Sequence, residues 1–123
     1  MKVKKVKIGI KNIKDIFDDV KNTVRKIEQG EKLKSVKEPE IYFTSFEAFR
    51  KALTPKRLEL LHIIKTKKPS SINHLSRLVK RDIKNVFDDV KYLEQIGLIE
   101  KREHEREIRP FIGYDKIDLE IAV

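Results

Sequence analysis

Apolar residues in the chain follow two different periods. From Val3 to Ile10 they alternate with lysine, which is the period of a half-buried strand. The following apolar residues recur every three to four positions and predict one long helix that ends at Gly30. They are Ile13, Ile16, Phe17, Val20, Val24 and Ile27. Such a stripe must pack against another part of the chain or against a second copy, and we expect a dimer interface here.

The next segments are short. Glu31 to Pro39 is charged and predicts a linker, and Glu40 to Phe43 predicts a short strand. Thr44 and Glu47 have the spacing of a capping box, which predicts a short helix through Leu53.

Three consecutive helices are predicted from Thr54 onward. Thr54 supplies a capping hydroxyl before a proline at the first helical position. Ser70 or Ser71 caps the second helix, Asp82 can cap the third, and Gly97 ends it in the left-handed conformation. The apolar residues predicted to face the core are Leu58, Leu60, Leu61, Ile64, Ile72, Leu75, Leu78, Val79, Ile83, Val86, Phe87, Val90 and Leu93.

The carboxyl-terminal part predicts strands. Leu98 and Ile99 open one strand, residues 101–109 are charged with turn character, and residues 110–114 form a returning strand. Residues 115–123 alternate and predict a last strand. The predicted fold class is mainly α with a small β-sheet (α+β). We expect a dimerisation extension over residues 1–53 and a winged helix-turn-helix domain, with the last strand, over residues 54–123.

Charge favours an anionic partner. The chain has 29 Lys+Arg against 20 Asp+Glu, a formal net charge of +9, and neutralising phosphates releases counterions. The excess lies in residues 1–38 and 54–79, whereas residues 80–109 have eight cationic and eight acidic side chains. The chain has no cysteine, which excludes disulfides and thiolate metal sites. No apolar run approaches the roughly 20 residues of a membrane helix, so a cytoplasmic protein is predicted.

No enzyme chemistry is evident. Asp18–Asp19 and Asp88–Asp89 are adjacent on predicted helices, where neighbouring side chains point about 100° apart and do not converge on one ion. His62, His74 and His104 have no metal-ligand spacing. There is no glycine-rich phosphate loop and no nucleophile elbow. We therefore predict a protein without catalytic activity, cofactor or metal.

Two nine-residue segments are nearly identical: IKDIFDDVK at Ile13–Lys21 and IKNVFDDVK at Ile83–Lys91. A duplicated domain would extend the similarity beyond these residues, and it does not extend. We interpret the agreement as chance similarity between two amphipathic helices.

The segments LTPKRLELL at Leu53–Leu61, SINHLSRLVKRDIKNVFDDVKYLEQIGLIE at Ser71–Glu100 and YDKIDLEI at Tyr114–Ile121 carry a resemblance. The sequence resembles winged-helix regulators of the MarR/ArsR-like type, and more closely a family of DNA-binding regulators predicted in archaea and bacteria. The segment RDIKNV at Arg81–Val86 is its most specific part. The resemblance implies sequence-specific binding to double-stranded DNA as a homodimer, and some relatives are antitoxin-like.

Within that resemblance, residues 82–96 form the recognition helix in the major groove and residues 98–114 the wing on the backbone or minor groove. Base contacts are expected from Arg81, Lys84, Asn85 and Asp88. Backbone contacts are expected from Lys56, Arg57, Ser70, Ser71, Arg77, Lys91 and Tyr92. The wing candidates are Lys101, Arg102, His104, Arg106 and Arg109.

Three functions remain open on the sequence alone. The preferred one is a dimeric transcriptional regulator whose two recognition helices meet a palindromic operator. The second is an antitoxin or protein-interaction module that binds a small co-encoded toxin through the amino-terminal extension. The third is binding of structured RNA or general chromatin, which would be salt-sensitive and without sequence preference.

Overall fold

The structure, a computed structural model, describes residues 4–30 and 40–122. The predicted strand start at Val3, the predicted linker at 31–39 and Val123 lie outside the described residues. The chain divides into two compact units. Unit 1 comprises residues 1–52 and 116–123, and unit 2 comprises residues 53–115. Helices and small sheets together give the α+β class that the sequence predicts.

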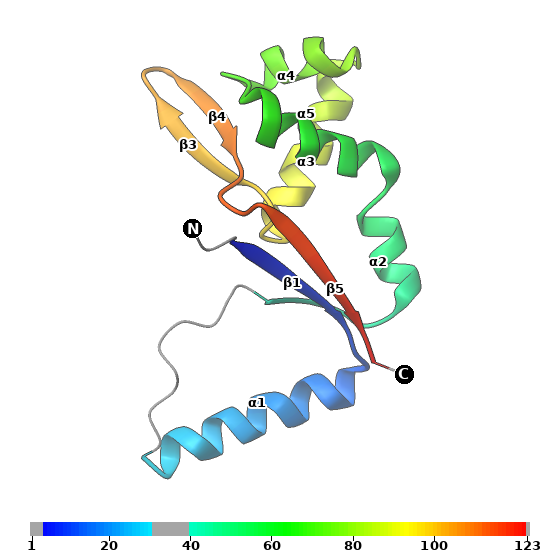
Figure 1. Ribbon diagram of the computed structural model, residues 1–123, viewed down its shortest axis with the longest axis vertical. Helices are drawn as coiled ribbons and strands as arrows, with labels where there is room; N and C mark the ends of the chain where they lie inside the picture. The colour runs from blue at the N-terminus through cyan, green and yellow to red at the C-terminus, as the bar shows by residue number, and fades with distance from the viewer. Residues whose placement is uncertain (1–3, 31–39, 123) are drawn as a thin grey trace. The chain divides into compact units, whose positions relative to one another are not determined.

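The sheet of unit 1 has the strand order β2-β1-β5 and is parallel throughout (Figure 1). Its strands are β1 (Lys5–Ile10), β2 (Glu40–Phe43) and β5 (Lys116–Ile121). In the central register, Ile8 lies opposite Ile41 on one side and Leu119 on the other. The sequence analysis predicts that the last strand belongs to the domain over residues 54–123. It pairs instead with β1, because its alternation matches that of β1 over six residues.

The two faces of this sheet differ in chemistry. One face carries Val6, Ile8 and Ile10, all buried. The opposite face carries ion pairs from Lys5 to Asp118 at 3.6 Å and from Lys7 to Glu120 at 2.8 Å. The side-chain hydrogen bond between Lys7 and Glu120 raises the pKa of the lysine and lowers the pKa of the carboxylate. This face is therefore polar and ionic.

Helix α2 (Phe46–Ala52) follows β2 and packs beside it. The rings of Phe43 and Phe49 meet edge to face, with centroids 5.8 Å apart. The predicted cap at Thr44 is wrong by one residue, because the Ser45 Oγ accepts the bond from the Ala48 amide at 3.0 Å. A serine at this position satisfies an amide that the first helical turn leaves free.

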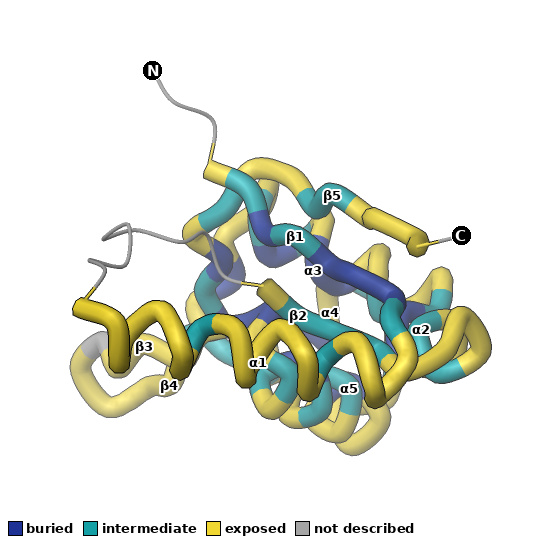
Figure 2. The backbone as a smooth tube through the Cα atoms, turned by 90° about the horizontal axis from the view of Figure 1, so that it is seen from below, coloured by how far each residue is buried: buried dark blue, intermediate teal, exposed yellow. Residues whose placement is uncertain are grey.

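Helix α1 (Ile13–Glu28) agrees with the predicted long helix. The Asn12 side chain caps it by accepting from the Asp15 amide at 2.8 Å, and Gly30 follows with a φ of 76°. No residue of α1 is buried, and Figure 2 shows the helix exposed along its length. The helix is therefore well defined by its local sequence without being packed into its unit.

Unit 2 contains three helices and a hairpin. The helices are α3 (Pro55–Lys67), α4 (Ile72–Val79) and α5 (Ile83–Gln95), and the hairpin consists of β3 (Glu100–His104) and β4 (Glu107–Phe111). The helices pack against one another, and β4 contacts α3 and α4. Figure 1 shows the hairpin projecting beside the helices.

The helix boundary signals in unit 2 are largely confirmed. Thr54 caps α3 by accepting from the Arg57 amide at 3.2 Å, and Ser71 caps α4 by accepting from the His74 amide at 3.0 Å. Gly97 has a φ of 92° and ends α5, where the next amide bonds to the Leu93 carbonyl at 2.9 Å. Asp82 is wrong as a side-chain cap, because it occupies the N-cap position of α5 without making that bond.

The core of unit 2 contains fewer of the helix residues than the sequence predicts. Its buried apolar residues are Leu53, Leu60, Leu61, Ile64, Leu75, Val86, Val90, Leu93, Leu98, Ile99 and Ile112. Four residues predicted to face it are exposed over 39–47% of their surface: Leu58, Leu78, Ile83 and Phe87. Each lies at the edge of an apolar stripe, and three short helices with one hairpin cover only the centre of each stripe.

The hairpin also differs from its prediction. The first strand begins at Glu100, after Leu98 and Ile99 have entered the core, and the second begins at Glu107 rather than at residue 110. Charged residues at 101–109 form most of both strands. Most residues of the two strands are charged and exposed, so residues 101–109 show no apolar alternation that would predict a strand.

Candidate nucleic-acid interface

One carboxylate of helix α5 binds two arginines of unit 2. Asp89 accepts from the Arg57 Nε at 3.0 Å and from an Arg81 Nη at 2.7 Å. The three side chains are exposed over only 17–21% of their surface. The Arg57 guanidinium also lies over the Tyr92 ring, 4.1 Å from its centroid. This cluster joins α3, the segment before α5 and α5 itself.

The cluster changes the roles of three predicted contact residues. Arg81, expected to reach a base, directs its guanidinium at Asp89, and its Nη1 is buried without a hydrogen-bond partner among the described residues. Arg57 and Tyr92, expected at the DNA backbone, contact each other and are half-buried. The structure thus uses these side chains to orient α5. The sequence analysis considered Asp89 only as half of the Asp88–Asp89 pair and did not predict its two arginine partners.

The remaining predicted base contacts lie on an open face of α5. Lys84, Asp88 and Lys91 are exposed and follow one another at intervals of four and three residues, so they form one ridge. The buried residues Val86 and Val90 are each two positions further along. Because two residues correspond to about 200° of helix rotation, the ridge faces away from the core.

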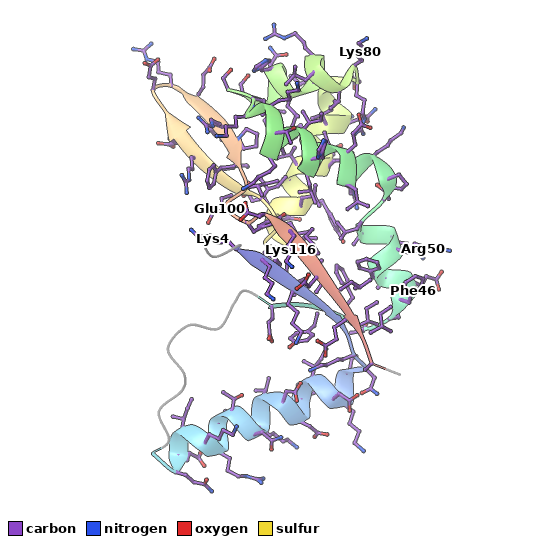
Figure 3. The ribbon with its side chains drawn as sticks, in the orientation of Figure 1. Lys4, Phe46, Arg50, Lys80, Glu100 and Lys116 are labelled. Carbon is purple, nitrogen blue, oxygen red and sulfur yellow. The ribbon has the colours of Figure 1, made fainter. Side chains whose placement is uncertain are left out.

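Other exposed residues border this ridge. Asn85 is exposed beside Lys84. Ile83 and Phe87 are each 46% exposed and give α5 an apolar edge that the sequence analysis had assigned to the core. Lys80, labelled in Figure 3, is exposed in the turn between α4 and α5, with a left-handed φ of 55°. Its position between two predicted helices was the available signal for it.

The residues of α3 and α4 that were predicted to contact the DNA backbone fall into two groups. Lys56 and Arg77 are exposed. Ser71 is a helix cap, and Ser70 donates its amide to the His74 Nδ1 at 3.1 Å. A helix amino terminus presents amides that suit a phosphate oxygen, so the α4 terminus and the two exposed cations offer backbone contacts from one unit.

The predicted wing residues lie on the hairpin. Lys101 pairs with Glu94 of α5 at 3.0 Å, and the Arg102 guanidinium lies 3.4 Å from the centroid of the Phe111 ring. Arg106 is exposed in the turn. Arg109 is half-buried, and its Nε is buried without a partner among the described residues. The side chain of His104 lies outside the described part of the structure.

These ion pairs alter the electrostatics expected from the sequence. Asp89 is held between two arginines and Glu94 by one lysine, so both carboxylates are neutralised inside unit 2. Among the described residues, no ion pair engages Lys84 or Lys91. The ridge itself carries two lysines and one aspartate, a net charge of +1.

The base of the hairpin is anchored by Tyr114. Its hydroxyl donates to the Leu98 carbonyl at 2.8 Å, and burial raises the pKa of this side chain. Within residues 4–30 and 40–122, no group of three acidic or histidine side chains is placed to hold a metal ion.

The predicted dimer residues are on α1 in unit 1. Five of them are exposed over 48–62% of their surface: Ile13, Phe17, Val20, Val24 and Ile27. Ile16 is half-buried. Figure 3 shows the side chains of α1 extending outward from the helix.

Comparison with known proteins gives one family match. The model of the HVO_A0114 family matches residues 52–119, which is 68 of the 123 residues. The match covers all of unit 2 and the first part of β5. A search of curated proteins finds no match to the chain. In the described part of the chain, no helix has the length and apolar character needed to span a membrane.

Proposed function

The chain belongs to the HVO_A0114 family, and we propose that it is a winged helix-turn-helix protein that binds double-stranded DNA as a homodimer and regulates transcription. In this proposal α4 and α5 form the helix-turn-helix, α5 is the recognition helix, and the β3–β4 hairpin is the wing. It acts in the cytoplasm, as the sequence predicts. The MarR/ArsR-like resemblance of the sequence agrees with this reading.

The observation that carries the proposal is the open ridge of α5. Lys84, Asp88 and Lys91 are exposed on a helix whose opposite side is buried and whose orientation is fixed through Asp89. The major groove of DNA is wide enough to admit one helix. A helix that presents a polar ridge while being rigidly held meets the geometric requirement for reading base edges.

The exposed side chains on and beside this ridge suit different parts of a duplex. Asn85 suits adenine, which offers one acceptor and one donor, and Lys84 suits the acceptors of guanine. Phe87 offers apolar surface to a thymine methyl group. Lys91 and Lys80 lie at the two ends of the ridge and suit phosphates. Arg81 becomes a positioning residue, because its guanidinium is directed at Asp89.

DNA binding is tested by fluorescence anisotropy with the DNA upstream of the gene. We expect the wild-type protein to bind with an affinity that falls as salt rises, because each phosphate contact releases counterions. The double variant Lys84→Ala/Lys91→Ala is expected to bind more weakly and to reduce the slope of log K against log[salt] by about one, because Lys91 is assigned to a phosphate. The matched control is Lys67→Ala/Lys68→Ala, which removes two exposed charges from the end of α3.

Two results would overturn the proposal. One is the absence of binding at low salt. The other is equal weakening by the α5 pair and the α3 pair, which would indicate attraction to net charge rather than a reading helix. Binding without preference for the upstream DNA over scrambled DNA would instead favour a general nucleic-acid binder.

An antitoxin function is a second candidate, and the exposed stripe of α1 favours it. A helix with five exposed apolar residues offers a surface to a partner protein. The discriminating experiment is co-expression with the product of the adjacent reading frame. Stable co-purification that is lost in Phe17→Ser would support a masked toxin, whereas unchanged self-association and no co-purification would exclude it.

A further inference from the structure

The exposed apolar residues of α1 have the spacing of a coiled-coil seam. Ile13, Phe17, Val20, Val24 and Ile27 succeed one another at intervals of four, three, four and three residues. Alternating intervals of four and three give a mean of 3.5 residues, which keeps one narrow seam facing one partner helix. All five are about half exposed. This seam suits another helix better than it suits a flat surface.

The sheet of unit 1 offers no cover for the seam. Its polar face carries the ion pairs of Lys5 and Lys7, and Lys11 lies 4.7 Å from the centroid of the Tyr42 ring. Lys11 also pairs with Asp19 of α1 at 2.7 Å. An apolar seam laid over these charges would desolvate them without supplying partners. Among the described residues of unit 1, the polar face of the sheet therefore supplies no apolar surface for the seam.

Charge along α1 identifies a surface that fits the seam. The first half of the helix, residues 13–20, has one lysine against three aspartates, a net charge of −2. The second half, residues 21–28, has three cations against one glutamate, a net charge of +2. Two copies placed side by side in the same direction would align like charges. Two copies in opposite directions place each acidic half beside a basic half.

We propose that α1 pairs antiparallel with α1 of a second copy of the chain. The pairing is two-fold symmetric, so the same seam is used by both copies. This inference rests on the homodimer of the proposed function and names its contact, but it does not depend on DNA. Of the three charged residues on one side of the seam, two support this direction, whereas Lys21 would face its own copy at the two-fold axis. Lys14 and Glu28 lie on the same side of it and face each other across an antiparallel pair, whereas a parallel pair brings neither one opposite a charge.

The length of α1 limits how strongly the two copies are expected to associate. Sixteen residues span about 24 Å, which is short for an isolated pair of helices. The dimer is therefore expected to be concentration-dependent. Sedimentation velocity over the micromolar range tests it, and we expect the wild-type chain to shift from monomer to dimer across that range.

Two substitutions that each introduce a carboxylate test where the interface lies. Val20→Asp places a carboxylate in the seam, and Asn22→Asp places the same group on the opposite side of the helix. We expect Val20→Asp to remain monomeric and Asn22→Asp to dimerise like the wild type. Circular dichroism of both variants checks that α1 is still helical. Dimerisation of Val20→Asp at wild-type strength would overturn the proposal, as would a wild-type chain that is monomeric throughout.

Crosslinking determines the direction independently of stability. The chain has no cysteine, so the variants Ile13→Cys and Ile27→Cys each introduce one thiol. These positions are 14 residues apart, about 21 Å along the helix. With a short bismaleimide, we expect a dimer from the mixture of the two variants and little from either alone.

The opposite pattern, with each variant crosslinking to itself and no heterotypic crosslink between positions 13 and 27 in the mixture, would show a parallel pair and overturn the inference. The DNA-binding proposal is judged separately. Intact heterotypic crosslinking with no DNA binding would count against the proposed function alone, and DNA binding by a chain that does not form the crosslink would count against the α1 pairing alone.

Discussion

Two helices of this protein have nearly the same nine residues and different surroundings. Residues 13–21 of α1 and 83–91 of α5 differ only at Asp15/Asn85 and Ile16/Val86. In α5, the equivalent valine, Val90, is 1% exposed, whereas Val20 in α1 is 54% exposed. The same local pattern thus forms a core helix in unit 2 and an open helix in unit 1.

The aspartates show the same contrast. Asp89 lies between two arginines with 17% of its side chain exposed, whereas Asp19 pairs with Lys11 and is 57% exposed. An amphipathic stripe determines that a helix forms and which side is apolar. It does not determine whether the apolar side meets the rest of its own chain.

The largest expected contrast is between Val90→Asp and Val20→Asp. A carboxylate at the buried position has no partner, so we expect Val90→Asp to destabilise unit 2 by about 4 kcal/mol or more. At the exposed position we expect a change within about 0.5 kcal/mol. Urea unfolding at low protein concentration measures both. Similar losses in the two variants would mean that the stripe of α1 is covered within its own chain.

A second contrast compares Asp89→Ala with Asp19→Ala. Removing Asp89 leaves two largely buried guanidinium groups without their carboxylate, and we expect a loss of about 2–4 kcal/mol. Removing the exposed Asp19 is expected to change stability by less than about 0.5 kcal/mol. Asp88→Ala is the control next to the cluster. Thermal unfolding that is equally insensitive to all three substitutions would remove the cluster as the feature that orients α5.

A third contrast uses one of the two differing positions. Asn85→Asp places a carboxylate on the proposed reading face, where it repels phosphates and cannot donate to a base, and we expect about tenfold weaker DNA binding. The reciprocal change in α1, Asp15→Asn, is expected to alter the affinity by less than about twofold. Anisotropy titrations on the same duplex compare them. Effects of equal size and opposite sign at the two positions would assign the DNA contact to net charge.

The smallest expected effect concerns the equivalent phenylalanines. If Phe87 contacts a thymine methyl, Phe87→Ala is expected to weaken binding by about three- to fivefold on thymine-containing DNA and to have little effect on the same DNA with deoxyuridine. Phe17→Ala acts through association of the two copies and leaves the ratio between the two DNAs unchanged. A ratio that is the same in wild type and Phe87→Ala would refute the methyl contact.

Much of the candidate site was predictable from the sequence because it depends on exposure. Lys84, Asn85 and Lys91 are polar residues on a strongly periodic helix, and polar residues on such a helix face water. The role of Arg81 was not predictable, because its partner Asp89 is eight residues away and a second arginine comes from α3. Phe87 was assigned to the core because its spacing fits the apolar stripe, and its exposure depends on how much of α5 the other helices cover.

The sequence by itself determined the helices and most of their ends, because capping hydroxyls, a proline and a left-handed glycine act within a few residues. It also determined β1 and β5, whose alternation is local. The tertiary structure decided that β5 joins β1 across more than a hundred residues, that Asp89 is shared by two arginines, and that the seam of α1 is left open. These outcomes depend on which surfaces meet in three dimensions, and two segments of nearly identical sequence contain no information about that choice.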